Sequence, residues 1–124
     1  AGHRLSTGAI EEVVAAHPDV AEGAVIGVAD SLKGELPIGL IVLNDGVTRA
    51  EEEITREIVN LVRTEIGPVT AFKRVIVVDQ LPKTRSGKIL RKTIKSIAES
   101  QDYVVPATID DSQVLNDITS AIAR

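Results

Sequence analysis

The segment 81–92, LPKTRSGKILRK, constrains this chain more than any other part of the sequence. It is rich in lysine and arginine and contains no acidic residue, although the whole chain has a formal net charge of −4. Pro82 ends the strand predicted before it, Gly87 after a serine is typical of a turn, and apolar residues recur at helical spacing from Ile89 onward. The segment therefore predicts a cationic loop that leads into a helix, with Lys88 near the junction.

The common explanations for a run of basic residues fit only part of this segment. Runs of like charge are often solvated helix faces, and residues 91–95 fit that description. Lys83, Arg85 and Lys88 do not, because they precede the helix. A nucleic-acid groove is disfavoured by the acidic net charge and by a content of one Phe and one Tyr. A phosphate-binding P-loop is excluded, because its first glycine and its final Ser or Thr are missing.

Length and composition limit the remaining choices. A chain of 124 residues makes one domain with a modest core. It contains no cysteine, so it has neither disulfides nor a thiol nucleophile, which fits a reducing compartment. It shows no signal peptide and no apolar run of about 18 residues, so we expect no membrane span. It has no methionine and opens at Ala1 in a predicted loop, so we expect a fragment of a longer protein.

The first half of the chain predicts a helix followed by a β-hairpin. Ser6 or Thr7 can cap a helix over 8–17, and Pro18 ends it. Strands are predicted over 20–29 and 37–43, with a polar turn between them. Neither His3 nor His17 has metal-ligand spacing, so we expect both histidines to be structural.

The second half predicts two further helices around one strand and the cationic segment. The first helix begins at a capping box, Thr48 to Glu51, and is ended by Gly67-Pro68. A β-branched strand follows over 74–78, and Asp110 is placed to cap a last helix. Together the elements predict an α+β domain in which a small three-stranded sheet is covered by helices.

The stretch LPKTRSGKILR, residues 81–91, resembles the C-terminal signature of the adenylate-forming (AMP-binding) acyl-CoA synthetases. Other segments stand in the order of that family and extend the resemblance over nearly the whole chain; they are Gly2-His3-Arg4-Leu5, Val25-Ile26-Gly27, Lys33-Gly34-Glu35 and Ile66-Gly67-Pro68. The resemblance implies that residues 1–124 are the mobile C-terminal lid domain of a short-chain acyl-CoA synthetase. The large N-terminal AMP-binding domain would then lie outside this chain.

The resemblance also implies a reaction in two halves. A small carboxylic acid first attacks the α-phosphate of ATP in the presence of Mg²⁺, and CoA then displaces AMP to form the thioester. ATP, CoA and Mg²⁺ would be bound mainly by the N-terminal domain, so the isolated chain is expected to be inactive. The endings 93–97 and 108–111 are more similar to the propionyl-CoA synthetase branch than to acetyl-CoA synthetase.

Lys88 matches the catalytic lysine of adenylation in this family. An ammonium on a long flexible stem suits the negative charge that gathers where carboxylate, α-phosphate and pyrophosphate meet. The resemblance makes Lys83, Arg85, Ser86 and Gly87 the supporting loop, with Lys83 as the rival for the catalytic role. Lys88 is also the residue on which a lysine acetyltransferase and deacetylase would act. Acetylation would remove its charge and would therefore abolish adenylation.

Three residues resemble the family's CoA contacts. Gly2 would let the backbone approach the pantetheine arm, and Arg4 would bind a phosphate through its guanidinium. Arg63 matches a residue that contacts a CoA phosphate, although both arginines could instead form surface ion pairs. Ala1 stands where acetyl-CoA synthetases often carry Ser, so a hydroxyl contact is not expected there.

Two functions from different classes follow from the sequence. The first is the C-terminal domain of an ATP-dependent acyl-CoA ligase, located in the cytoplasm, or in the mitochondrial matrix in a eukaryote. The second is a non-catalytic module that binds an anionic partner through the basic segment 82–92.

Overall fold

A three-stranded sheet forms the middle of the molecule in the computed structural model, which describes residues 7–32, 34–67 and 71–124. Its strands are β1 (Val20–Asp30), β2 (Gly34–Leu43) and β3 (Arg74–Val77), in the order β1-β2-β3. Strands β1 and β2 form an antiparallel hairpin, with Ile26 opposite Ile38, and β3 pairs in parallel with β2. The predicted three-stranded sheet is therefore confirmed, and so is the hairpin.

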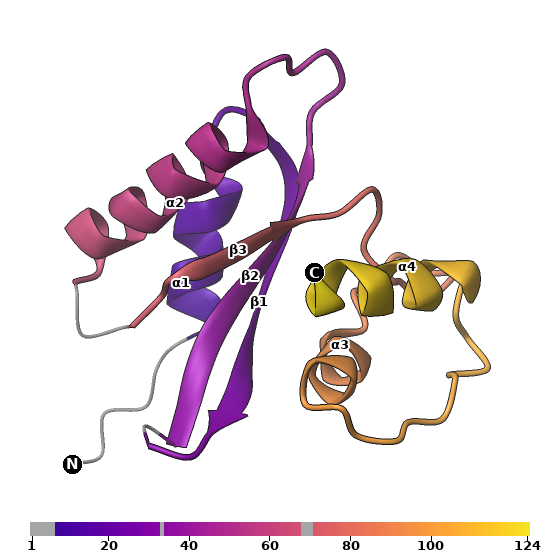
Figure 1. Ribbon diagram of the computed structural model, residues 1–124. Helices are drawn as coiled ribbons and strands as arrows, with labels where there is room; N and C mark the ends of the chain where they lie inside the picture. Colours follow the sequence, from indigo (N-terminus) through magenta and orange to yellow (C-terminus); the bar gives the residue numbers. More distant parts are fainter. Residues whose placement is uncertain (1–6, 33, 68–70) are drawn as a thin grey trace.

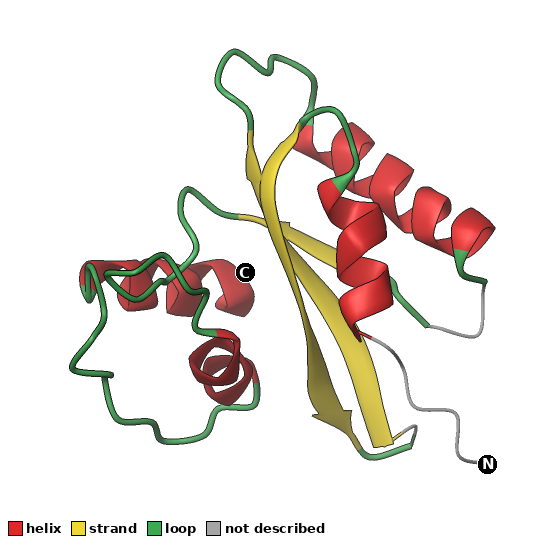
Figure 2. Ribbon diagram, turned by 180° about the vertical axis from the view of Figure 1, so that it is seen from behind, coloured by secondary structure: helices red, strands yellow, loops and turns green. Residues whose placement is uncertain are grey.

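Two helices cover each face of the sheet (Figures 1 and 2). Helices α1 (Thr7–Ala15) and α2 (Glu51–Glu65) lie on one face, and α3 (Arg91–Ala98) and α4 (Gln113–Ala123) lie on the other. This arrangement follows from the alternation of side chains along a strand, which sends neighbouring residues to opposite faces. Val25 packs against α1 and α2, whereas its neighbours Ala24 and Ile26 pack toward α3 and α4.

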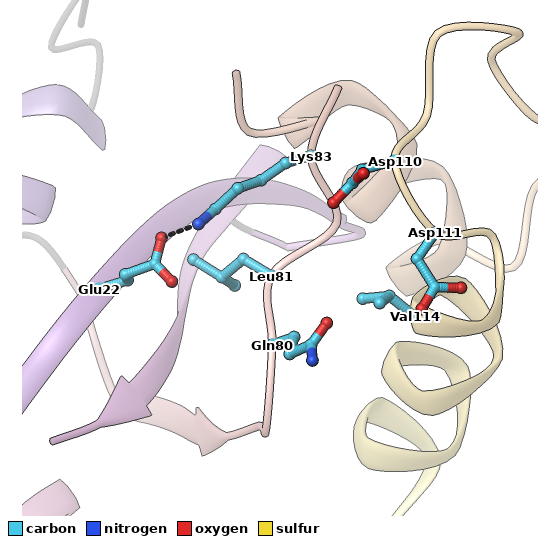
Figure 3. A pocket seen from close by; sticks show the side chains of 7 residues that line it. All are labelled: Glu22, Gln80, Leu81, Lys83, Asp110, Asp111 and Val114. Carbon is cyan, nitrogen blue, oxygen red and sulfur yellow. Dashed lines mark ion pairs between the residues drawn. The ribbon is translucent and has the colours of Figure 1, made fainter. Parts of the chain in front are cut away.

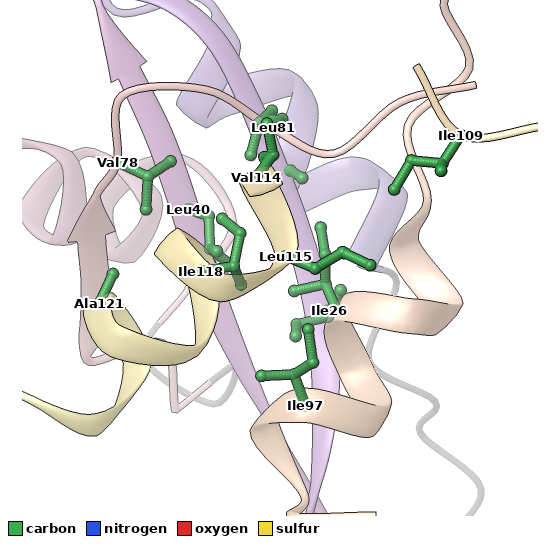
Figure 4. Packing of buried hydrophobic residues seen from close by; sticks show 12 residues of the cluster. Ile26, Leu40, Val78, Leu81, Ile97, Ile109, Val114, Leu115, Ile118 and Ala121 are labelled. Atoms are coloured by element: carbon green, nitrogen blue, oxygen red, sulfur yellow. The ribbon is translucent and has the colours of Figure 1, made fainter. Parts of the chain in front are cut away.

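Each pair of helices closes its own hydrophobic core. Under α1 and α2 the largest fully buried side chains include Ile10, Ile54 and Ile58. Under α3 and α4 the core joins β1 and β2 to the start of the cationic segment (Figure 4). Its buried members are Ala24, Ile26, Leu40, Val78, Leu81, Ile94, Ile97, Ile109, Val114, Leu115, Ile118 and Ala121. The position of the loop after Leu81 is thus determined by packing as well as by hydrogen bonds.

The starts of two helices differ from the predictions. The capping box from Thr48 is wrong: α2 begins at Glu51, after an N-cap residue, Ala50, that offers no side-chain hydrogen bond. Three glutamates in its first turn complement the helix dipole instead. Helix α3 begins at Arg91 rather than Ile89, because Ile89 pairs with the strand-like segment before the turn.

The last helix is also capped differently from the prediction. The carboxylate of Asp111, not of Asp110, accepts a hydrogen bond from the Gln113 amide at 3.0 Å. The helix itself carries the predicted apolar face, with Leu115 and Ile118 buried. In the part of the chain that the structure describes, no helix is long and apolar enough to cross a membrane.

Candidate functional site

The cationic loop is a tight hydrogen-bonded turn. The Gly87 amide donates to the Thr84 carbonyl at 2.8 Å, and the Thr84 amide donates to the Lys88 carbonyl at 2.9 Å. The Lys88 amide donates to the Thr84 hydroxyl oxygen at 3.1 Å, and this hydroxyl lies 2.9 Å from that of Ser86. Every residue from 84 to 88 is therefore held by the backbone or by Thr84, and the turn is more ordered than the sequence suggested.

The two arms of the turn pair with each other and with the segment before α4. Lys83 and Ile89 form an antiparallel bridge, and the Leu90 amide donates to the Pro82 carbonyl at 2.9 Å. On the outer side, the Asp110 amide donates to the Lys83 carbonyl, also at 2.9 Å. The turn is thus one end of a small irregular sheet that rests on the core under α3 and α4.

Lys83 does not project freely into solvent. Its ammonium forms an ion pair with Glu22 of β1, which Figure 3 shows beside a cavity of about 230 Å³. The lining of this cavity is mostly polar and acidic; it consists of Glu22, Gln80, Leu81, Lys83, Asp110, Asp111 and Val114. The rival for the catalytic role is therefore already neutralised by a carboxylate of its own domain.

Arg91 and Lys95 also have carboxylate partners. Arg91 binds Glu11 of α1 through two nitrogens, at 2.9 and 2.7 Å, and this contact raises the pKa of Arg91. Lys95 contacts Glu99 at 3.0 Å and Glu35 at 3.2 Å, and the hydrogen bond to Glu99 raises its pKa. These two residues of the predicted solvated helix face are thus substantially exposed and also ion-paired.

Arg85 and Lys88 differ from these neighbours. Both are exposed, and within the described residues neither side chain has a hydrogen bond or an ion pair. The turn therefore presents two unpaired cations, whereas Lys83, Arg91 and Lys95 near it are ion-paired. Such a group can meet an external anion without first breaking an internal ion pair.

The residues expected to bind CoA are only partly described. Arg63 is exposed in the last turn of α2, and its guanidinium has no partner among the described residues. It belongs to the helix pair on one face of the sheet, whereas Lys88 leads into α3 on the other (Figure 1). Gly2 and Arg4 lie outside the described residues. The structure therefore brings Arg85 close to Lys88 but does not bring Arg63 there.

His17 has the structural role that its spacing predicts. It is 6% exposed, its Nε2 lies 2.9 Å from a Glu57 carboxylate oxygen, and its Nδ1 accepts the Asp19 amide at 3.1 Å. His3 lies outside the described residues. Throughout 7–32, 34–67 and 71–124, no three His, Cys, Asp or Glu side chains gather where they could hold a metal ion.

Glu11 and Glu22 are the site residues that sequence reasoning missed. Each carboxylate lies far along the chain from the cation it binds, with 80 positions separating Glu11 from Arg91. Neither belongs to a motif of recognisable spacing. Only the tertiary fold, which packs α1 and α3 against the two faces of β1, brings them to the turn.

Comparisons with known proteins agree with this architecture. A family model described as the AMP-binding enzyme C-terminal domain matches residues 9–88. An acyl-CoA synthetase short-chain family member B, mitochondrial, of Dictyostelium discoideum is 52% identical over 117 residues, which are 94% of this chain and 17% of the relative. An acetyl-coenzyme A synthetase of Pyrobaculum arsenaticum is 45% identical over 121 residues, or 98% of this chain and 18% of the relative.

A solved structure extends the similarity to the fold. An acetoacetyl-CoA synthetase from Streptomyces lividans superposes with a TM-score of 0.75 over 94% of this chain and 18% of that one, at 22% identity. At this identity the likeness concerns the fold alone. The chain spans less than a fifth of the length of the relatives it matches.

Proposed function

This chain belongs to the family of AMP-binding enzyme C-terminal domains, and we propose that it is the C-terminal lid domain of an ATP-dependent short-chain acyl-CoA ligase. The enzyme would convert propionate or acetate, ATP and CoA into acyl-CoA, AMP and pyrophosphate. The carboxylate, ATP and most of CoA would be bound by a separate N-terminal AMP-binding domain. Synthetase names among the relatives support this reaction class.

The observation that carries the proposal is the contrast between Lys88 and Lys83. Lys83 is paired with Glu22, whereas Lys88 is exposed and without a partner in the described chain. When the domain closes over an acyl-adenylate site, Lys88 would bring an uncompensated positive charge to the α-phosphate. A preorganised charge placed where negative charge develops lowers the activation barrier of adenylation.

The other binding roles are assigned by the same reasoning. Arg63 has a free guanidinium and fits a CoA phosphate through paired N–H donors, and Gly2 and Arg4 would line the pantetheine path. Arg85 would support the charge of Lys88, and Ser86 and Gly87 would shape the turn. We assign the Mg²⁺ that accompanies ATP to the N-terminal domain together with ATP itself.

The test separates the two half-reactions in the full-length enzyme. Lys88→Ala is expected to lower propionate-dependent ATP–pyrophosphate exchange by about 10²- to 10³-fold, and to leave thioester formation from preformed propionyl-adenylate intact. Arg63→Ala is expected to give the converse result, with normal exchange and a raised KM for CoA. Lys73→Ala, which removes an exposed lysine outside the turn, is the control. Normal exchange in Lys88→Ala would contradict the proposal and favour a non-catalytic anion-binding module.

Regulation and substrate choice extend the proposal. Lys88 is accessible to a lysine acetyltransferase and a deacetylase, and enzyme acetylated at Lys88 should behave as Lys88→Ala does in both assays. We favour propionate over acetate, which a higher kcat/KM for propionate would support. We place the enzyme in the cytoplasm, or in the mitochondrial matrix of a eukaryote, and cell fractionation would test this location.

A further inference from the structure

Two carboxylates from the first part of the chain hold the two arms of the Lys88 turn. Glu22 binds Lys83 on the arm that enters the turn, and Glu11 binds Arg91 directly after the arm that leaves it. Lys88 lies between the two tethered cations and has no side-chain contact of its own among the described residues. Its place relative to α1 and β1 therefore depends on two ion pairs that do not touch it.

Glu11 is the better defined of these tethers. One of its oxygens accepts both the Arg91 Nε at 2.9 Å and the Val25 amide at 3.0 Å, and the other accepts an Arg91 terminal nitrogen at 2.7 Å. A bidentate pair fixes direction as well as distance, because the guanidinium fork and the carboxylate share a plane. Glu11 thereby joins α1, β1 and the first residue of α3.

Glu22 supports the opposite arm in a similar way. It lies on β1 at the edge of the cavity in Figure 3, and Lys83 reaches it across that edge. The backbone of Lys83 is bridged to Ile89, the residue after Lys88. A displacement of Lys83 is therefore transmitted to the backbone beside Lys88.

We infer that Glu11, acting through Arg91, and Glu22, acting through Lys83, are positioning residues that aim Lys88 during adenylation. This inference rests on the proposed role of Lys88. Neither carboxylate would touch substrate. Each would fix the position and orientation of the turn relative to the rest of the domain. Closure of the domain would then bring the Lys88 ammonium to one defined position.

The exposure of the two ion pairs distinguishes a role in positioning Lys88 from a role in folding stability alone. The side chains of Glu11 and Arg91 are 21% and 44% exposed, and those of Lys83 and Glu22 are 31% and 37% exposed. Ion pairs this exposed contribute modestly to folding stability, the bidentate Glu11–Arg91 pair more than the Lys83–Glu22 pair. Misplacing a catalytic group by about 1 Å, in contrast, can lower a rate by about 10²-fold. The effect on adenylation should therefore far exceed the effect on stability.

The decisive experiment is a double-mutant cycle in the full-length enzyme. Glu11→Gln keeps an oxygen for the Val25 amide but removes the charge that Arg91 binds. It is expected to lower the kcat of ATP–pyrophosphate exchange by about ten- to hundredfold, with KM for ATP within about twofold and thioester formation unchanged. In the Lys88→Ala background it should cause no further loss, because residues that act as a unit are non-additive. Arg91→Lys, which keeps the charge without the fork, should lose less than Glu11→Gln.

Arg49→Gln is the matched control. Arg49 is 35% exposed and binds Asp19, Glu53 and Glu57, but these contacts lie in α2 and directly before β1, away from the turn. It should lower the thermal unfolding midpoint about as much as Glu11→Gln and leave exchange normal. If Glu11→Gln lowers exchange equally in both Lys88 backgrounds, or impairs both half-reactions, the positioning role is overturned. If Lys88→Ala itself leaves exchange intact, the proposed function fails, and the positioning role fails with it.

Discussion

At the scale of single residues, the turn that carries Lys88 depends on the backbone of Gly87. Its φ of +91° lies in the left-handed region that residues with a Cβ seldom adopt. No atom would obstruct a Cβ at this position, so the conformation alone decides the effect of a substitution. Gly8 is the useful contrast, because it also has open space around it but lies within α1.

Gly87→Ala and Gly8→Ala should therefore change stability in opposite directions. Gly87→Ala is expected to lower the free energy of unfolding by about 1–2 kcal/mol, since the folded backbone becomes strained. Gly8→Ala is expected to raise it by about 0.5–1 kcal/mol, since alanine restricts the unfolded chain and favours a helix. Urea unfolding of both variants measures the difference. Equal effects would show that the turn relaxes without strain.

Predictions about single residues succeeded where nearby residues in the sequence determine the local structure. The turn at Gly87 and the exposure of Lys88 follow from neighbours in the sequence, whereas the contact of His17 with Glu57 joins residues 40 positions apart. The partners of Lys83 and Arg91 could not be predicted, because Glu22 and Glu11 reach them only through the tertiary fold.

At the scale of elements, the start of α2 is held by a network of charges rather than by a cap. Arg49 binds Glu53 and Glu57, and Glu57 also contacts the buried His17. The hydrogen bonds from Arg49 and then from His17 lower the pKa of Glu57 from its ordinary 4.5 to about 2. The capping box at Thr48 was predicted from local spacing. In its place Arg49 pairs with Glu53 and Glu57 close by in the sequence, and the network extends to Asp19 and His17 much earlier in the chain.

The lowered pKa of Glu57 predicts an acid-sensitive start of α2. A carboxyl group with a lower pKa in the folded state stabilises that state above its unfolded pKa, and this contribution disappears as pH falls toward the folded value. The thermal unfolding midpoint should therefore decrease between about pH 5 and pH 2. Arg49→Gln should make this decrease shallower, because it removes the main cause of the shift. Circular dichroism measures the thermal unfolding midpoint of both proteins at each pH. Parallel curves of midpoint against pH would contradict the assignment of this acid sensitivity to Glu57.

At the scale of the whole molecule, one sheet separates two cores that have different relations to the candidate site. Ile58 is fully buried under α1 and α2, and Ile118 is fully buried under α3 and α4. Only the second core contains Leu81, which begins the cationic segment. Hydrophobic periodicity predicted both apolar faces, but the assignment of each helix to a side of the sheet required the structure.

Ile58→Ala and Ile118→Ala are a matched pair for this difference. Each should lower the free energy of unfolding by about 2–5 kcal/mol, because each leaves a cavity where a large side chain was fully buried. Amide hydrogen exchange should then distinguish the two variants. Ile118→Ala should reduce protection of the Thr84 and Gly87 amides more than Ile58→Ala does. Equal loss of protection would show that the two cores open together.

The division into two cores also sets an order for synthesis. All the elements that close the α1/α2 core have been translated once β3 ends at Val77, whereas the other core needs α4, residues 113–123. At roughly 5–20 residues per second, the ribosome needs several seconds to supply that last helix. During this interval the sheet face bearing Ile26 and Leu40 lacks the cover of α4, and the nascent chain is then more exposed to aggregation. Glu11 likewise waits for Arg91, so both ion pairs beside Lys88 can form only after the elements of the α1/α2 core have been translated.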